Sequence, residues 1–152
     1  MKGMILPFSG EEHTRQVMEI WLEASRIAHS FVPMSYWEAT APLVEGEILP
    51  QADTRVFVRE GRVEGFLSLI EGDHIGALFV APQSQGQGIG RALLEDCKAR
   101  RELLTLAVYK QNLQAVGFYQ SQGFSVLEER TQEETGEREY LMVWRKAAAS
   151  RA

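Results

Sequence analysis

Apolar residues in the first third of the chain recur every three or four positions, which is the spacing of one face of an α-helix. This pattern predicts a helix from Glu11 to Ala28. Ser9 is a suitable N-cap, and Glu12 would complete a capping box with it. The segment "HSFVP" then interrupts the pattern, and a second helix is predicted from about Ser35 to about Glu47. The apolar positions of the first helix are Val17, Ile20, Trp21, Ala24, Ile27 and Ala28.

The pattern changes after residue 53, where β-branched and apolar runs are separated by glycine turns. Two such runs around Gly61 predict a β-hairpin, and a third follows the turn at Gly72–Asp73. The run "LLTLAVY" is continuous and predicts a buried strand. The predicted strands are Thr54–Glu60, Arg62–Glu71, Gly72–Pro82, Leu103–Tyr109, Phe124–Arg130 and Arg138–Arg145, with a possible first strand at Gly3–Phe8. The predicted helices between them are Gly88–Arg101 and Leu113–Gly123.

This order of elements predicts an α/β protein, a mixed sheet with helices on both faces. The length of 152 residues fits one domain, which we expect to span residues 1–146, with a frayed tail at residues 147–152. Two strand-to-helix transitions stand out as ligand sites, because the N-terminus of each helix points at the end of a strand.

Composition narrows the function. A net charge of −5, with acidic and basic residues interleaved, argues against nucleic acid as a partner and favours a cationic small molecule or a basic peptide. No apolar run is long enough to cross a membrane, and the N-terminus lacks the pattern of a signal peptide. The single cysteine, Cys97, excludes an internal disulfide, so we expect a cytoplasmic protein. The three histidines show no zinc-binding spacing, so no metal is expected.

Three glycines stand on alternate residues, Gly86, Gly88 and Gly90, between a strand and a helix. Without Cβ atoms, successive backbone N–H groups can turn toward one anion, and the helix dipole adds positive charge there. Arg91 would add further charge. The stretch "GQGIGR" matches neither a dinucleotide fingerprint nor a P-loop. The pattern therefore indicates a phosphate cradle of another kind, the alternative being an ordinary turn before a helix.

The spacing Gln85-x-x-Gly88-x-Gly90 resembles the coenzyme A pyrophosphate loop of the GNAT superfamily, the GCN5-related N-acetyltransferases. A second stretch, "LAVYKQNLQAVGFYQSQGF", resembles the other half of that family's site, with Asn112 after a strand and Tyr119 in the "FYxxxGF" pattern. The whole chain looks most like the small bacterial stand-alone members. The resemblance implies a mostly antiparallel sheet of six to seven strands with about four helices, splayed at its central parallel strands.

The resemblance also implies the cofactor, acetyl-CoA, and its contacts. The pantetheine arm would lie between the splayed strands and pair with main-chain groups near Leu78, Phe79 and Val80. Asn112 and Tyr119 would contact the pantetheine and the thioester, although Asn112 is also a good helix N-cap. The pyrophosphate would lie on the loop residues Gln85, Gly86, Gln87, Gly88, Ile89, Gly90 and Arg91.

Three demands follow from direct attack of an amine on the acetyl carbonyl. The departing thiolate needs a proton, which we expect from Tyr119 unless it is a plain buried aromatic. The oxyanion needs a donor, for which the main-chain N–H of Phe79 or Val80 is suited. The amine must lose a proton, to His74, to Glu71 or to a chain of water molecules. These three routes stay open at this stage, because an isolated histidine on a strand is often structural.

The segment "HSFVP" overhangs the acceptor in this superfamily, so His29 and Phe31 are candidates for the acceptor pocket. The alternatives are a helix C-terminal role for His29 and a core role for Phe31. Tyr36–Trp37 and Cys97 are expected to pack in the core.

The function that these residues favour is N-acetyltransfer from acetyl-CoA to a primary amine, which is a protein lysine, an N-terminus or a small molecule. The alternative is a non-catalytic, acyl-CoA-binding regulatory module, which would need the loop but not Tyr119. The protein is expected to be a monomer or a homodimer.

Overall fold

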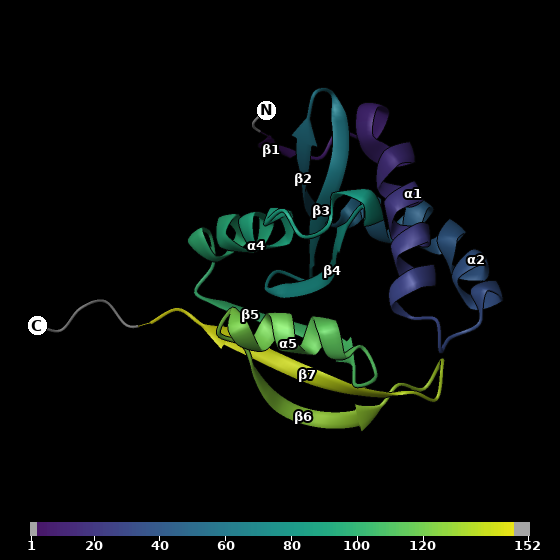
Figure 1. The fold of residues 1–152 in the computed structure, drawn as a ribbon, viewed down its shortest axis with the longest axis vertical. Helices are drawn as coiled ribbons and strands as arrows, with labels where there is room; N and C mark the ends of the chain where they lie inside the picture. The colour runs from purple at the N-terminus through teal and green to yellow at the C-terminus, as the bar shows by residue number, and fades with distance from the viewer. Residues whose placement is uncertain (1–2, 148–152) are drawn as a thin grey trace, which may run out of the picture.

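The computed structural model describes residues 3–147, so the predicted tail lies outside the described residues from position 148 onward. Its centre is a seven-stranded sheet in the order β1-β2-β3-β4-β5-β7-β6 (Figure 1). Every neighbouring pair is antiparallel except β4 and β5, so the predicted mixed, mostly antiparallel sheet is confirmed. The strands are β1 (Met4–Pro7), β2 (Asp53–Arg59), β3 (Arg62–Ile70), β4 (His74–Val80), β5 (Leu103–Tyr109), β6 (Ser125–Thr131) and β7 (Arg138–Arg145).

Helices cover both faces of the sheet and enclose a separate core on each (Figure 1). Along β4 the side chains alternate, so that Phe79 packs toward α1 and α2 while Leu78 packs toward α4 and α5. None of the helices between residues 3 and 147 has the length and hydrophobicity that crossing a bilayer requires. The helices are α1 (Gly10–Ala28), α2 (Met34–Leu43), η1 (Val44–Ile48), α3 (Leu49–Gln51), α4 (Ile89–Ala99) and α5 (Leu113–Ser121), with a short 3₁₀ turn η2 (Pro82–Ser84).

The predicted capping box at the start of α1 is wrong. Ser9 is the N-cap, but its side chain makes no capping hydrogen bond. Its backbone N–H instead donates to Nδ1 of His13 at 2.9 Å. His13 is buried, and its ring lies 6.1 Å from that of Phe8. The imidazole therefore lies against the first turn and accepts the backbone N–H of Ser9, which the capping box assigns to Glu12.

The second helical segment is longer than predicted. It continues past Glu47 through the π-turn η1 into α3, and ends at Gln51. Pro50 lies in the last turn of this continuous run, directly after the π-turn η1, and contributes no backbone N–H to it. Leu49 is buried and anchors this end against the core below α1. Tertiary packing of Leu49 therefore accompanies a helical segment that ends four residues later than predicted.

The sheet opens between β4 and β5. These strands pair only at His74↔Thr105 and Ile75↔Leu106. Beyond them β4 pairs with β3 alone, and a bulge leaves Gly76 without a partner. A Cβ on Gly76 would lie 3.1 Å from the Ile70 side chain, so a larger residue here would require Ile70 to shift by a few tenths of an ångström. Because a bulge bends its strand, β4 turns away from β5 here, and the predicted splay is confirmed.

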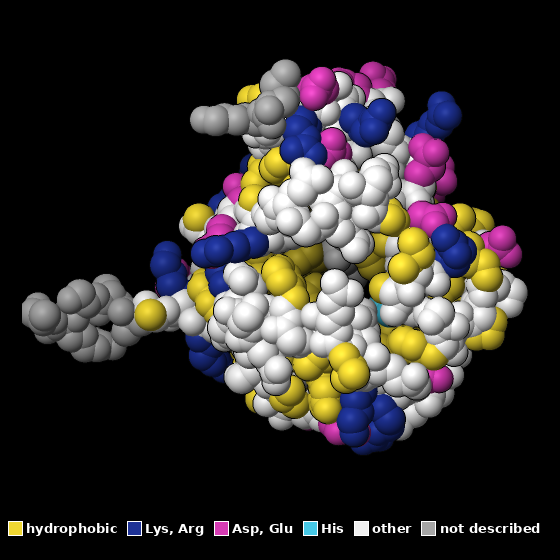
Figure 2. Space-filling model, in the orientation of Figure 1, with side chains coloured by type: hydrophobic (Ala, Val, Ile, Leu, Met, Phe, Trp, Pro, Cys, Tyr) yellow, Lys and Arg dark blue, Asp and Glu magenta, His cyan; other side chains and the backbone are white. Residues whose placement is uncertain are grey.

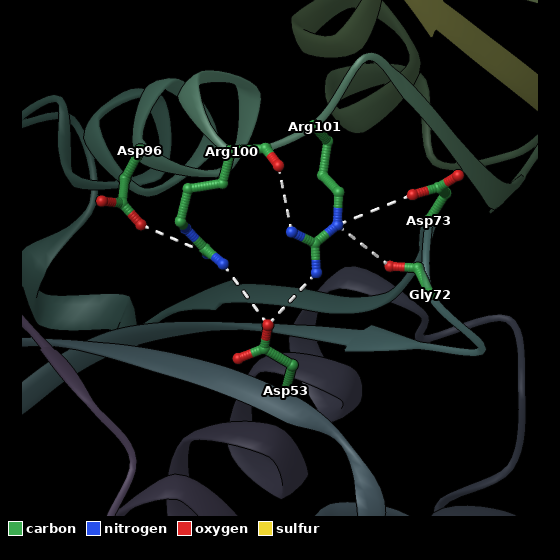
Figure 3. Close-up of polar contacts among 6 residues, drawn as sticks. All are labelled: Asp53, Gly72, Asp73, Asp96, Arg100 and Arg101. Carbon is green, nitrogen blue, oxygen red and sulfur yellow. Dashed lines mark hydrogen bonds and ion pairs between the residues drawn. The ribbon is translucent and has the colours of Figure 1, made fainter.

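Charged residues hold the closed end of this opening together (Figure 3). Arg100 and Arg101, at the end of α4, both contact Oδ2 of Asp53 at 3.3 Å. Arg101 also lies 3.6 Å from the carboxylate of Asp73, in the turn before β4. These contacts join α4, β2 and the β3–β4 turn beside the point where the two strands still pair.

Candidate functional site

The glycine loop lies at the open end of β4 and leads into α4. Gly86 and Gly88 have φ angles of +81° and +83°, which favour glycine. Gly88 is the N-cap of α4 and offers no side chain, so the first N–H groups of the helix have no side-chain partner. Gly90 differs, because it is helical and its added Cβ would lie 3.7 Å from Phe118 and from Val80. The predicted backbone reason for glycine therefore holds at positions 86 and 88 but not at 90.

The glutamine side chains of the loop bind protein rather than reaching outward. Gln85 donates from Nε2 to the carbonyl of Val80 at 3.3 Å. Gln87 accepts through Oε1 from the guanidinium of Arg59 at 2.8 Å. Ile89 is buried and Arg91 is exposed. The backbone N–H groups of the loop are thus the groups best placed to receive an anion.

Arg59, at the end of β2, is a loop-supporting residue that the sequence did not reveal. It forms a bidentate pair with Glu64, and this hydrogen bonding is the main reason that the pKa of Glu64 is lowered. Arg59 and Gln87 are separated by 28 residues. No local pattern connects two residues so far apart, which is why sequence reasoning missed the contact.

A cleft with hydrophobic walls follows the opening between the strands. Figure 2 shows a hollow in the middle of this face, between the loop that leads into α4 and the helix α5. Leu78 and Val80 of β4 and Phe118 of α5 are partly buried hydrophobic residues on this side of the sheet. The main-chain groups of Leu78–Val80 that face β5 have no strand partner, so they can pair with an extended ligand.

Tyr119 lies on α5, on the same side of the sheet. Its side chain is 9% exposed, and its ring packs between Phe118 at 5.3 Å and Phe124 at 5.6 Å. Burial raises the pKa of Tyr119, with no neighbouring charge or hydrogen bond opposing it. The hydroxyl therefore keeps its proton at neutral pH.

Asn112 and His29 meet at the mouth of the opening. Asn112 is the N-cap of α5, and its Oδ1 accepts the backbone N–H of Ala115 at 3.2 Å. Its Nδ2 lies 3.3 Å from Nε2 of His29. An amide nitrogen only donates, so Nε2 of His29 must accept and the ring proton must lie on Nδ1. The N-cap role of Asn112 is confirmed, and its contact with a ligand stays a prediction.

His29 is the C-cap of α1 and is surrounded by aromatic rings. Its ring lies 4.9 Å from Tyr109, 5.4 Å from Trp37 and 6.3 Å from Phe79, measured between centroids. Burial lowers the pKa of His29 to about 4, so the imidazole is neutral at pH 7. Its Nδ1 is buried without a hydrogen-bond partner among the described residues. Because Asn112 occupies the other ring nitrogen, His29 has no free lone pair with which to act as a base.

His74 and Glu71 lie at the closed end of the opening. Nδ1 of His74 is 2.8 Å from Oγ1 of Thr105 on β5. Burial lowers the pKa of His74, while the nearby charge of Glu71 raises it. Glu71 is exposed and occupies the β3–β4 turn with a φ of +50°.

The two candidate proton-transfer groups lie on opposite faces of the sheet. Leu104 and Leu106 belong to the core under α4 and α5, so Thr105, and His74 with it, faces the other side. From Thr105 the strand β5 advances about 13 Å to Tyr109. Helix α5 then runs back along it (Figure 1), rising about 10 Å between Asn112 and Tyr119. Tyr119 and His74 therefore lie at a similar level along the opening.

A groove of about 370 Å³ lies between the start of α2 and the β6–β7 loop, which meet at the lower right of Figure 1. Phe31 and Tyr36 line one side, and Glu134 and Thr135 line the other. Trp37 is buried as predicted. Tyr36 is half-buried and lines the groove, so the prediction that it packs in the core is only partly correct.

Cys97 is fully buried in the core under α4, as predicted. Burial raises the pKa of its thiol to about 11, which leaves no thiolate at neutral pH. Within residues 3–147 no three His, Cys, Asp or Glu side chains gather as metal ligands would. The absence of a metal from the reaction stays a prediction.

Comparison with known proteins identifies the family. The family model described as an acetyltransferase (GNAT) domain matches residues 23–146. The chain belongs to this GNAT family, and it is an N-acetyltransferase. The enzymatic interpretation of the sequence is confirmed, and the regulatory-module alternative is not supported.

Two relatives from Escherichia coli K12 extend the comparison. The chain is 38% identical to the peptidyl-lysine N-acetyltransferase YiaC over 84% of this chain and 88% of the relative. It is 37% identical to the peptidyl-lysine N-acetyltransferase YjaB over 78% of this chain and 80% of the relative.

Solved structures agree on the fold. The apo form of YjaB from Escherichia coli superposes with a TM-score of 0.83 at 31% identity, covering 97% of this chain and 100% of that one. The PaiA N-acetyltransferase of Thermoplasma acidophilum, solved with coenzyme A, superposes with a TM-score of 0.78 at 18% identity, covering 95% and 99%.

Proposed function

We propose that residues 1–146 form one catalytic domain that transfers the acetyl group of acetyl-CoA to the ε-amine of lysine residues in peptides or proteins. One observation carries the proposal: the separation of β4 from β5 opens a cleft that leads to the uncapped N-terminus of α4. The names of the relatives YiaC and YjaB support a peptidyl-lysine acceptor.

The residues present fit coenzyme A. The loop from Gln85 to Arg91 offers backbone N–H groups and a helix N-terminus to the pyrophosphate. The unpaired main chain of Leu78–Val80 suits the amide groups of pantetheine. Asn112 lies at the mouth of the cleft, and the second hydrogen of its Nδ2 can donate to the same arm while the first stays bound to His29.

The chemistry requires an acyl thioester, which acetyl-CoA supplies. The lysine nitrogen forms a bond to the acetyl carbon, and the carbon–sulfur bond then breaks. The main-chain N–H of Phe79 or Val80 stabilises the oxyanion between these steps. Tyr119 donates its proton to the departing sulfur, which lies on its side of the sheet. The raised pKa of Tyr119 keeps the phenol protonated at neutral pH but makes it a weak acid, so proton donation depends on close contact with the departing sulfur.

His74 removes the proton from the amine through water, because β4 rises about 16 Å from His74 to the N–H of Phe79 that would hold the oxyanion. Glu71 supports His74 by charge. This role requires Nδ1 of His74 to donate to Oγ1 of Thr105, which leaves the lone pair on Nε2 free. The lowered pKa of His74 keeps that lone pair available at neutral pH. The base therefore acts on the face of α1 and α2, opposite Tyr119, so the acceptor and the leaving group occupy different sides.

The setting proposed for this reaction is the cytoplasm, with the protein acting as a monomer or homodimer and without a metal ion. A single buried cysteine supports a reducing compartment. The acidic net charge of −5 supports a basic acceptor rather than nucleic acid or a membrane surface.

Calorimetric titration with acetyl-CoA, followed by a thiol-release assay on lysine peptides, N-terminal amines and small amines, tests the proposal. We expect binding, and release of free coenzyme A with lysine peptides. Tyr119→Phe should leave the Kd of acetyl-CoA unchanged and lower kcat about 100-fold. His74→Gln should remove the acidic limb of the pH profile. Binding without transfer to any lysine peptide would contradict the proposed acceptor.

A further inference from the structure

The groove between α2 and the β6–β7 loop continues into the proposed acceptor site. Phe31, which lines it, lies 5.2 Å from the ring of Tyr109 and 5.9 Å from that of His29. The hydroxyl of Tyr109 donates to Oε1 of Gln132 in the β6–β7 loop at 3.2 Å. Thr135 donates to the same oxygen, so the loop is held against the end of β5. A peptide whose lysine enters beside His29 would place its neighbouring residues in this groove.

The two segments that flank the groove are rich in glutamate, and Glu134 lines the groove itself. Residues 29–51 contain three glutamates, Glu38, Glu45 and Glu47, and neither lysine nor arginine. The β6–β7 loop, residues 132–137, also contains three glutamates and neither basic residue. A peptide lying in the groove therefore meets the carboxylate of Glu134 on the side of the β6–β7 loop and uncharged side chains on the side of α2.

The basic residues nearest to the loop are already paired. Lys110 and Arg138 contact Glu129, and Arg130 contacts Glu139. Glu134 forms no ion pair with any residue between 3 and 147. Glu134 lines the groove. Burial is the main reason that the pKa of the Tyr36 hydroxyl is raised, and the nearby charge of Glu134 raises it further. Glu134 is thus a free negative charge beside two aromatic side chains.

We propose that Glu134 and Tyr36 form a specificity subsite for a lysine or arginine located within two residues of the acetylated lysine. The carboxylate of Glu134 pairs with the cationic head, and the rings of Tyr36 and Phe31 pack along the aliphatic stem. An extended peptide advances about 3.3 Å per residue, so the distances between Phe31, Tyr109 and His29 correspond to one or two residues. This inference rests on the proposed lysine acetyltransferase function.

Three peptides that differ only beside the acceptor lysine test the subsite: one with arginine, one with alanine and one with glutamate. For the wild-type protein we expect a KM about fivefold lower with arginine than with alanine, and a higher KM with glutamate, at similar kcat. Salt at about 0.5 M should remove most of this preference, because it screens exposed charges.

Glu134→Gln should abolish the preference while keeping kcat on the alanine peptide. Glu133→Gln is the matched control, since Glu133 is exposed on the same loop but does not line the groove. It should keep the preference. Equal use of all three peptides by the wild type, or equal loss in the two variants, would overturn the subsite alone. Transfer to small amines but to none of the peptides would instead overturn the lysine acceptor itself.

Discussion

His29 and His74 differ in what surrounds each imidazole, and this decides which one can take a proton. His29 is enclosed by aromatic rings, and its one basic nitrogen accepts from Asn112. His74 bonds Thr105 through one nitrogen, and its pKa is lowered less strongly. The two rings are indistinguishable as isolated histidines in a sequence. These surroundings support the proposal that His74 removes the proton and that His29 does not.

The burial of His29 makes folding stability depend on pH. Its pKa is about 4 in the folded protein, compared with about 6.5 when exposed, so the unfolded chain binds the extra proton first. The stability that buried, neutral His29 adds to the folded protein is therefore fully present above pH 6.5, and it is lost as the pH falls toward 4. We expect this loss to reach about 3 kcal/mol at most, measured by urea unfolding between pH 7 and pH 4.

His29→Gln provides the comparison, because glutamine cannot titrate while acidic groups elsewhere titrate equally in both proteins. As the pH is lowered from 7 to 4, the free energy of unfolding should decrease less in the variant than in the wild type. Parallel curves for the two proteins would show that His29 is not buried in its neutral form.

At the scale of an element, the start of α4 shows that glycines in one motif serve different needs. Gly88 has a left-handed backbone and Gly90 does not. Gly88→Ala should cost about 1–2 kcal/mol in the free energy of unfolding, because a Cβ is strained at positive φ. It should also weaken acetyl-CoA binding, since the loop must move to relieve that strain.

Gly90→Ala is the matched control within the same motif. Its Cβ would lie at ordinary contact distance from Phe118 and Val80, and alanine favours a helix over glycine. Stability should stay equal or rise slightly. Urea unfolding measures the stability of both variants, and calorimetry measures their affinity for acetyl-CoA. An equal loss of stability in the two would contradict the inference that position 88 requires glycine because of its positive φ.

The sequence predicted the bounds of helices and strands correctly where they depend on a local pattern. The strands β5 and β7 have the predicted bounds, since apolar runs of this length are typical of buried strands. The capping box failed because His13 is buried against Phe8, and the second helix ran on because Leu49 packs under α1. Both differences come from contacts made by a neighbouring residue rather than from the propensity of the residue concerned.

At the scale of the whole molecule, the sheet consists of two parts that meet through two residue pairs of β4 and β5. Acetyl-CoA would contact both parts if its arm lies between β4 and α5, as proposed above. Ligand at about 100 times its Kd should stabilise the protein by about 2.7 kcal/mol. For a chain of this size that corresponds to a rise in Tm of about 5–10 °C.

Scanning calorimetry with and without acetyl-CoA measures this shift. ADP at the same concentration is the control, because it carries the pyrophosphate without the pantetheine arm. It should raise Tm less. An equal shift with both ligands would indicate that only the loop is occupied and that the cleft does not receive the arm.

Local features could be inferred from the residues alone: the strands, the glycine loop, the buried Cys97 and the order of elements that defines the fold. These depend on neighbours a few positions apart, such as the turn at Gly86 and Gly88 or the alternation along β4. Only the tertiary structure joined Arg59 to Gln87, His29 to Asn112 and Glu134 to Tyr36. These pairs lie far apart along the chain, and they meet because the folded sheet brings together the ends of elements that are distant in the sequence.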